Sequence, residues 1–147
     1  MIKSVHKKLF KGFTLIELLI VIAILGILAA AVLVAINPGK RTRQAQDAKR
    51  KNDIGALATE VQGYYTTPGQ GFYPTTLAVL TTQSYLKQMP LDPTATVAYG
   101  YSINAGTTEA AIWATLAEPI TSGSPVWCYR TQAGVVVENS TTVGCTP

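Results

Sequence analysis

The sequence predicts an α+β fold in which one long N-terminal helix packs on a small antiparallel β-sheet. Three features of the 147 residues indicate this fold. An unbroken apolar run fills residues 13–36, an amphipathic helical pattern covers residues 37–65, and turns with alternating strand-like runs fill residues 66–147. A short basic segment, residues 1–12, precedes the apolar run. These four segments are the expected divisions of the chain.

The apolar run is long enough to cross a membrane. As a helix, its 24 residues would span roughly 36 Å, against about 30 Å for the hydrocarbon core of a bilayer. A secretory signal also has a basic start and an apolar middle, and Ala29-Ala30-Ala31 imitates its cleavage site, but this run continues to Ile36. A plain single-pass anchor would explain the length. Neither alternative explains the carboxylate at Glu17.

Glu17 is the one charged residue within the apolar run. A charge is costly in a bilayer or in a protein core unless a partner matches it. The segment from Phe13 to Ile36 contains no cation. A cut between Gly12 and Phe13 would create a new α-amino group four residues before Glu17. That group supplies the missing positive charge, in the same chain or in a neighbour packed beside it.

A second helix is expected from about Lys40 to Tyr65, separated from the first at Asn37-Pro38. Asn before Pro is a typical cap and first turn of a new helical segment. Apolar residues then recur at three- and four-residue steps along one face. The members of that face are Ala45, Ala48, Ile54, Leu57, Ala58, Val61, Tyr64 and Tyr65.

The head is expected to hold a short helix and an antiparallel meander. The helix is placed near Thr76 to Lys87, after a turn-rich loop. Alternation of apolar residues predicts the strands. They are expected at residues 97–103, 110–117, 126–130 and 134–138, with turns at 104–106 and 131–134. Most of the head's tyrosines and tryptophans are expected in the core or in cross-strand pairs.

The run from Gly12 to Glu17, following a short basic leader, strongly resembles the prepilin peptidase site of type IV pilins and the related pseudopilins. The close match covers roughly residues 11 to 36. The resemblance implies that residues 1–12 are a leader peptide, that the peptidase cuts after Gly12 and that it methylates Phe13. It also implies that Glu17 pairs with the N-terminus of an adjacent subunit during assembly, and that the fold is type IV pilin-like.

The same resemblance implies partners and locations. The partners are other copies of the chain in a helical homopolymer, the prepilin peptidase, and an inner-membrane assembly platform with its ATPase motor. Nucleic acid is a partner only if the chain serves DNA uptake. Before assembly the chain would be a single-pass protein of the cytoplasmic membrane, and afterwards part of an extracellular fibre.

Charge is unevenly placed along the chain. The leader holds four lysines, while the rest of the chain holds eight basic and eight acidic residues, which argues against a nucleic-acid-binding domain based on global charge. Six of those basic residues cluster within residues 40–51. Counting positive flanks alone would place the head in the cytoplasm, whereas the resemblance places it outside, and we adopt the latter. The cluster would touch lipid headgroups, touch acidic patches of neighbouring subunits, or form a solvated helix face.

Cys128 and Cys145 are the only cysteines. In an exported protein they are expected to form one disulfide, and the pair resembles the closed C-terminal region of pilins. In a cytosolic protein they would be two free thiols. Neither lies near a histidine, which makes them a poor metal site. Major pseudopilins usually carry a calcium site in the head, but no dense Asp/Asn cluster is visible here, so no metal and no cofactor is expected.

The sequence carries no catalytic motif. Its one histidine, His6, lies in the expected leader, so the mature chain would lack a His-based triad or zinc site. The triplet Asn139-Ser140-Thr141 fits a glycosylation acceptor but is better explained as a turn. The chain is therefore expected to be no enzyme. The favoured function is a structural subunit of a type IV pilus; the alternatives are a pseudopilin of a type II secretion or DNA-uptake system, and a membrane-anchored binding module that never polymerises.

Overall fold

The computed structural model describes residues 12–67, 69–94 and 98–147. The expected leader, apart from Gly12, and Val97 of the first expected strand lie outside these residues. The chain divides into two compact units, with the boundary between Pro38 and Gly39. A long helix followed by a four-stranded antiparallel sheet confirms the predicted α+β fold.

The first unit is dominated by helix α1 (Leu15–Ile36). Thr14 caps its start in an extended conformation, and Asn37 ends it in the left-handed region with φ 48°. Its 22 residues are apolar apart from Glu17. Among the described helices, α1 alone is long and apolar enough to cross a membrane. At about 1.5 Å per residue it is roughly 33 Å long.

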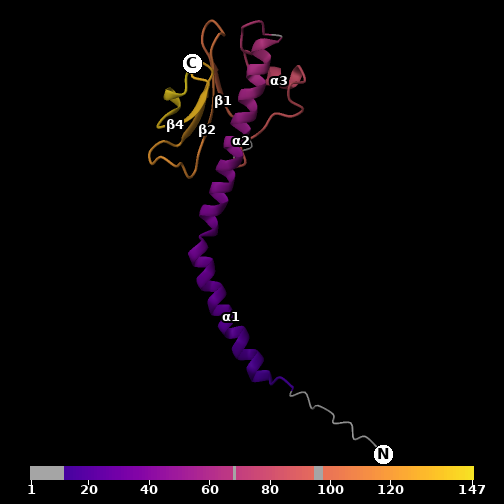
Figure 1. Ribbon diagram of the computed structural model, residues 1–147, viewed down its shortest axis with the longest axis vertical. Coiled ribbons are helices and arrows are strands. Elements are labelled where there is room, and N and C mark those ends of the chain that lie inside the picture. Colours follow the sequence, from indigo (N-terminus) through magenta and orange to yellow (C-terminus); the bar gives the residue numbers. More distant parts are fainter. Residues whose placement is uncertain (1–11, 68, 95–97) are drawn as a thin grey trace, which may run out of the picture. The chain divides into compact units, whose positions relative to one another are not determined.

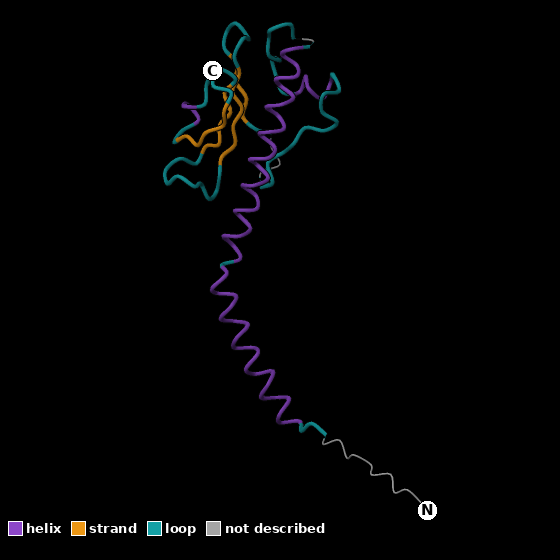
Figure 2. The backbone as a smooth tube through the Cα atoms, viewed as in Figure 1, coloured by secondary structure: helices purple, strands orange, loops and turns teal. Residues whose placement is uncertain are grey.

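Helix α2 (Pro38–Thr66) begins at Pro38, which suits the first helical position because a proline there loses no hydrogen bond. Ile54, Leu57 and Val61 on α2 are fully buried. Their three- and four-residue spacing places them on one face of the helix, as the sequence predicted. In Figures 1 and 2 the strands of the head lie beside α2.

The third helix is shorter than expected. The sequence predicted a helix near residues 76–87, but α3 (Ala78–Thr82) has only five residues. The chain turns at Ser84, whose φ of 61° lies in the left-handed region. As a result the amides of Tyr85 and Leu86 both donate to the carbonyl of Leu80, at 2.9 and 3.0 Å. This closing turn resembles a common helix C-terminal motif and prevents continuation.

The sheet is a simple meander in the order β1-β2-β3-β4, with every neighbouring pair antiparallel. Its strands are β1 (Gly100–Ile103), β2 (Ala110–Thr115), β3 (Val126–Arg130) and β4 (Val135–Asn139). Gly100 faces Trp113 across β1 and β2. A side chain at Gly100 would overlap the indole of Trp113, which explains a glycine within this strand.

One face of the sheet forms the main core with α2 and α3. Fully buried Leu57, Leu80 and Ile112 come from three different elements and belong to one cluster. Each such side chain contributes about 1.5–3 kcal/mol relative to exposure. The expected role of the head's aromatic residues is confirmed, because eight of them lie in this core or pack against it: Tyr64, Tyr65, Tyr73, Tyr85, Tyr99, Tyr101, Trp127 and Tyr129.

The opposite face of the sheet carries a second, smaller cluster around the two cysteines. Cys128 on β3 and Cys145 are joined in a disulfide, with their Cα atoms 5.7 Å apart. Both are fully buried, beside Ala111 and Val126. Closing a loop with a sequence separation of 17 residues stabilises the fold by about 3 kcal/mol in the chain-entropy account. The disulfide thereby fastens the C-terminal segment to the sheet.

Candidate assembly site on the apolar helix and the ion-pair cluster of the head

The peptide bond between Gly12 and Phe13 lies in non-helical chain just before α1. Both residues are exposed, Phe13 to 80%. A peptidase can bind an exposed, non-helical segment, whereas a helical bond would first have to unwind. The expected cleavage and methylation residues therefore lie together in an accessible segment.

Glu17 forms a capping box with Thr14 at the start of α1. Its Oε2 accepts from the backbone amide of Thr14 at 2.8 Å and from the Thr14 hydroxyl at 2.7 Å. In return, the Glu17 amide donates to Thr14 Oγ1 at 3.3 Å. This arrangement satisfies groups that a helix start leaves unpaired, but supplies the carboxylate with no positive charge. From the sequence, only a cation was predicted as the partner of Glu17, although the Thr-x-x-Glu spacing is itself the signal of a capping box.

The surface of α1 is not covered by the rest of the described chain. None of its residues is buried. A helix that is apolar all round requires a membrane or other protein around it. The site therefore combines an accessible peptide bond, a carboxylate without a cation, and an apolar surface that needs a partner.

Comparison with known proteins matches this segment to a described family. Residues 7–33 match the prokaryotic N-terminal methylation motif. The chain is also 32% identical over 97 residues to the type II secretion system core protein G of Escherichia coli (strain K12). The chain belongs to the pilin and pseudopilin family. The region aligned with the E. coli relative covers 56% of this chain and 66% of the length of that relative. No solved structure matches this chain.

The pilin and pseudopilin family is a structural group rather than an enzymatic one.

An ion-pair cluster at Arg50 joins elements of the head. Arg50 donates from Nε to Asp92 at 2.6 Å and from Nη1 to Asp47 at 2.7 Å. The side chains of Arg50 and Asp47 are each 5% exposed, and that of Asp92 is 14% exposed. Arg50 Nη2 also donates to Asp92 and to Thr94 Oγ1. We call Asp47, Arg50 and Asp92 the Arg50 cluster.

The Arg50 cluster connects α2 to two loops of the head. Asp92 lies in the loop before β1, and Asp47 accepts the backbone amides of Ala117 and Glu118 after β2, at 2.7–3.1 Å. The hydrogen bond with Asp92, together with the neighbouring carboxylates, raises the pKa of Arg50 despite its burial. Arg50 belongs to the basic run of residues 40–51, for which no internal partner was predicted. A signal for one was available, because Asp47 precedes Arg50 by three residues on the same helix.

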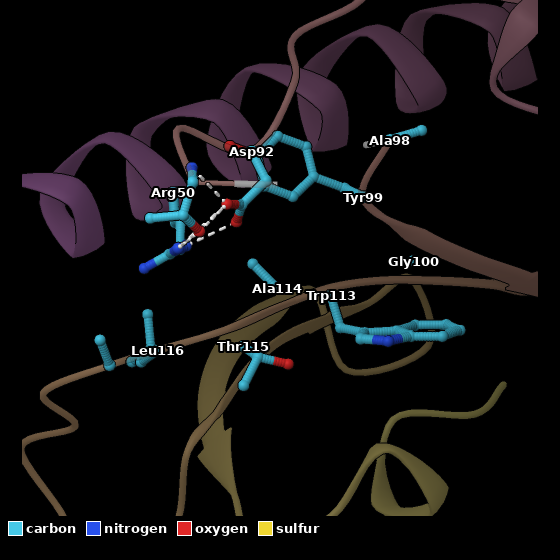
Figure 3. A pocket seen from close by; sticks show the side chains of 11 residues that line it. Arg50, Asp92, Ala98, Tyr99, Gly100, Trp113, Ala114, Thr115 and Leu116 are labelled. Carbon is cyan, nitrogen blue, oxygen red and sulfur yellow. Dashed lines mark hydrogen bonds and ion pairs between the residues drawn. The ribbon is translucent and has the colours of Figure 1, made fainter. Parts of the chain in front are cut away.

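A cavity of about 420 Å³ lies beside the Arg50 cluster. Figure 3 shows the guanidinium of Arg50 facing Asp92 at one end and the ring of Trp113 near the other. The nitrogens of Arg50 are already used by carboxylate and hydroxyl oxygens. We therefore interpret the cluster as a structural connection and not as a binding site for an anion.

Three further basic residues of the run 40–51 also form ion pairs. Arg43 pairs with Glu118 at 2.7 Å, Lys49 with Asp53 at 2.5 Å and Lys51 with Glu138 at 3.2 Å. Four of the six basic residues thus form ion pairs within the head. None of the three sequence-based interpretations of the basic run included internal pairing. Glu118 and Glu138 are distant in sequence from their partners, whereas Asp53 lies only four residues from Lys49 on the same helix.

Two weaker sequence signals can be placed. Asn139 lies in β4, and the Nδ2 of its side chain donates to the carbonyl of Gly144 at 3.2 Å. The triplet therefore begins at the last residue of β4 and continues into the bend that follows it. Within residues 12–67, 69–94 and 98–147, no three His, Cys, Asp or Glu side chains are grouped so that they could hold a metal ion.

Proposed function

We propose that this chain is a structural subunit that is cleaved between Gly12 and Phe13 and polymerises through α1 into a pilus-like fibre. The observation that carries the proposal is the uncovered apolar surface of α1, interrupted only by Glu17. Before assembly, the hydrocarbon of the cytoplasmic membrane would cover this surface. In the fibre, the α1 helices of neighbouring subunits would replace the lipid.

Glu17 gives the polymer its register in this proposal. The capping box satisfies hydrogen bonds of the carboxylate but leaves its charge unmatched. Cleavage would expose an ammonium group at Phe13 of each subunit. A pair formed between Glu17 and the ammonium of a neighbour removes two unmatched charges from a water-poor fibre core, and a shifted register would leave both unpaired.

Two kinds of fibre fit the proposal. The favoured one is a type IV pilus at the cell surface. The second is a pseudopilus of a type II secretion or DNA-uptake machine, and the identity to core protein G supports that alternative. In either case the partners would be other copies of the chain, the prepilin peptidase, and a membrane assembly platform with its ATPase motor.

Fractionation of cells tests the proposal. Cells are sheared, and the chain is measured in the released fibres and in the membranes. We expect polymer that sediments with the sheared material for a surface pilus. Polymer confined to the envelope would support the pseudopilus instead. Chain found only as monomer in membranes, even when overproduced, would contradict polymerisation and support an anchored binding module.

A further inference from the structure

The resemblance to major pseudopilins implies a calcium site in the loops of the head. Calcium is bound by about six to eight oxygen ligands, and carboxylates supply the negative charge that such a site needs. The chain has eight acidic residues, and one of them, Glu17, lies in α1. Five of the other seven already form ion pairs with basic residues of α2: Asp47, Asp53, Asp92, Glu118 and Glu138. The carboxylates of the head therefore do not fit a calcium site.

Two of these carboxylates hold the loop between β2 and β3, residues 116–125, which we call the β2–β3 loop. Asp47 on α2 and Glu138 on β4 accept four backbone amides of the loop, at 2.7–3.3 Å. The donors are Ala117, Glu118, Ile120 and Thr121. Both oxygens of each carboxylate accept at least one of these amides, so N–H groups occupy positions around them that a metal ion would need. The backbone is thereby held on both sides of Pro119.

A cation from α2 neutralises each of the two carboxylates. Nη1 of Arg50 lies 2.7 Å from Asp47, and Nζ of Lys51 lies 3.2 Å from Glu138. The side chains of Asp47 and Glu138 are only 5% and 8% exposed, so either charge would be costly without a partner. In a calcium site the metal supplies the positive charge. Here two adjacent residues of one helix supply it.

Lys51 is held beside Glu138 by a second contact. Its Nζ lies 4.2 Å from the centroid of the Trp127 ring, which is within the range of a cation–π interaction. Trp127 in turn pairs directly with Glu138 across β3 and β4. Burial acts to raise the pKa of Glu138, but the hydrogen bonds from the loop and from Lys51 outweigh it and lower the pKa. The carboxylate therefore holds the loop as a charged group at neutral pH.

We propose that Arg50 and Lys51 act as fixed cations that order the β2–β3 loop, so that the head folds without calcium. The inference concerns the head alone and does not depend on the proposed polymerisation. Both cations belong to α2, which also carries a face of the buried core, so folding of the head itself brings them to the loop. A loop built around a metal would instead lose its order when calcium is withdrawn.

Hydrogen exchange of the full chain in detergent tests whether the loop requires calcium. The amides of residues 116–125 are followed by mass spectrometry in EGTA and in millimolar calcium. We expect equal protection of the loop in both conditions. We also expect the same midpoint of urea unfolding, measured by tryptophan fluorescence. Faster exchange of the loop in EGTA, or a higher unfolding midpoint in calcium, would overturn the proposal.

Substitution of Lys51 tests the role of its charge. Lys51→Met should make the loop amides exchange roughly tenfold faster, because Glu138 loses its partner in a nearly buried position. Lys51→Arg keeps the charge and should keep most of the protection. The matched control is Arg41→Met on the same helix, which should leave the exchange unchanged. Arg41 is exposed and forms no ion pair within the described chain.

Two results would contradict a role for the Lys51 charge. In the first, the loop amides exchange no faster in Lys51→Met than in Arg41→Met. In the second, Lys51→Met and Lys51→Arg accelerate exchange equally, which would mean that packing of the lysine side chain holds the loop. The fluorescence midpoint of each variant shows whether the head as a whole is still folded, so a local effect on the loop can be separated from global unfolding.

Discussion

Replacing Glu17 with glutamine is expected to leave the chain cleaved and inserted in the membrane but to lower its incorporation into fibres about hundredfold. Glutamine can keep the hydrogen bonds to Thr14, because it also serves in a capping box. It removes only the charge. The ammonium at Phe13 of a neighbour would then remain unpaired in an apolar fibre core, at a cost of about 3 kcal/mol, which corresponds to roughly a hundredfold.

A second substitution at the same position separates charge from capping. Glu17→Leu removes both the charge and the capping hydrogen bonds. If pairing of charges drives assembly, Glu17→Gln and Glu17→Leu will be similarly defective when the chain is measured in sheared fibres and in membranes. Normal fibres from Glu17→Gln, with a defect only in Glu17→Leu, would show that Glu17 acts through the helix cap and would contradict the pairing between subunits.

The second large effect is expected in the Arg50 cluster of the head. Arg50→Met should lower the free energy of unfolding by about 3–5 kcal/mol, because it leaves Asp47 and Asp92 with unmatched charges in a nearly buried position. Urea unfolding of the full chain in detergent measures the change. Fluorescence reports on the head directly, since both tryptophans of the chain, Trp113 and Trp127, lie in the sheet.

The matched control is Arg43→Met on the same helix. Arg43 pairs with Glu118, but its side chain is 48% exposed, so the loss should be at most about 1 kcal/mol. If Arg50→Met costs no more than Arg43→Met, the Arg50 cluster does not stabilise the head as we infer.

Much of the fold could be predicted because its elements carry periodic patterns. The apolar run, the face of α2 that includes Ile54 and Leu57, and the alternation along β2 and β3 gave elements within about two residues of those observed. The length of α3 could not be predicted in this way. It depends on the left-handed conformation of Ser84, a residue that commonly occurs within helices as well as in turns.

The site was predictable only where its partners are close in sequence. The spacing of Gly12, Phe13 and Glu17 identified the N-terminal motif. By contrast, Arg50 and Asp92 are 42 positions apart, and Asp47 and Glu118 are 71 positions apart. Charges in a sequence do not indicate which distant group they meet, because that depends on tertiary packing.

Intact-mass spectrometry of the chain from sheared fibres tests the central claim most directly. We predict a species that begins at Phe13, carries one N-terminal methyl group, and is two hydrogens lighter than the reduced chain because of the disulfide between Cys128 and Cys145. Fibre-derived chain that retains residues 1–12 would contradict cleavage and, with it, the pairing of Glu17 with a neighbouring N-terminus.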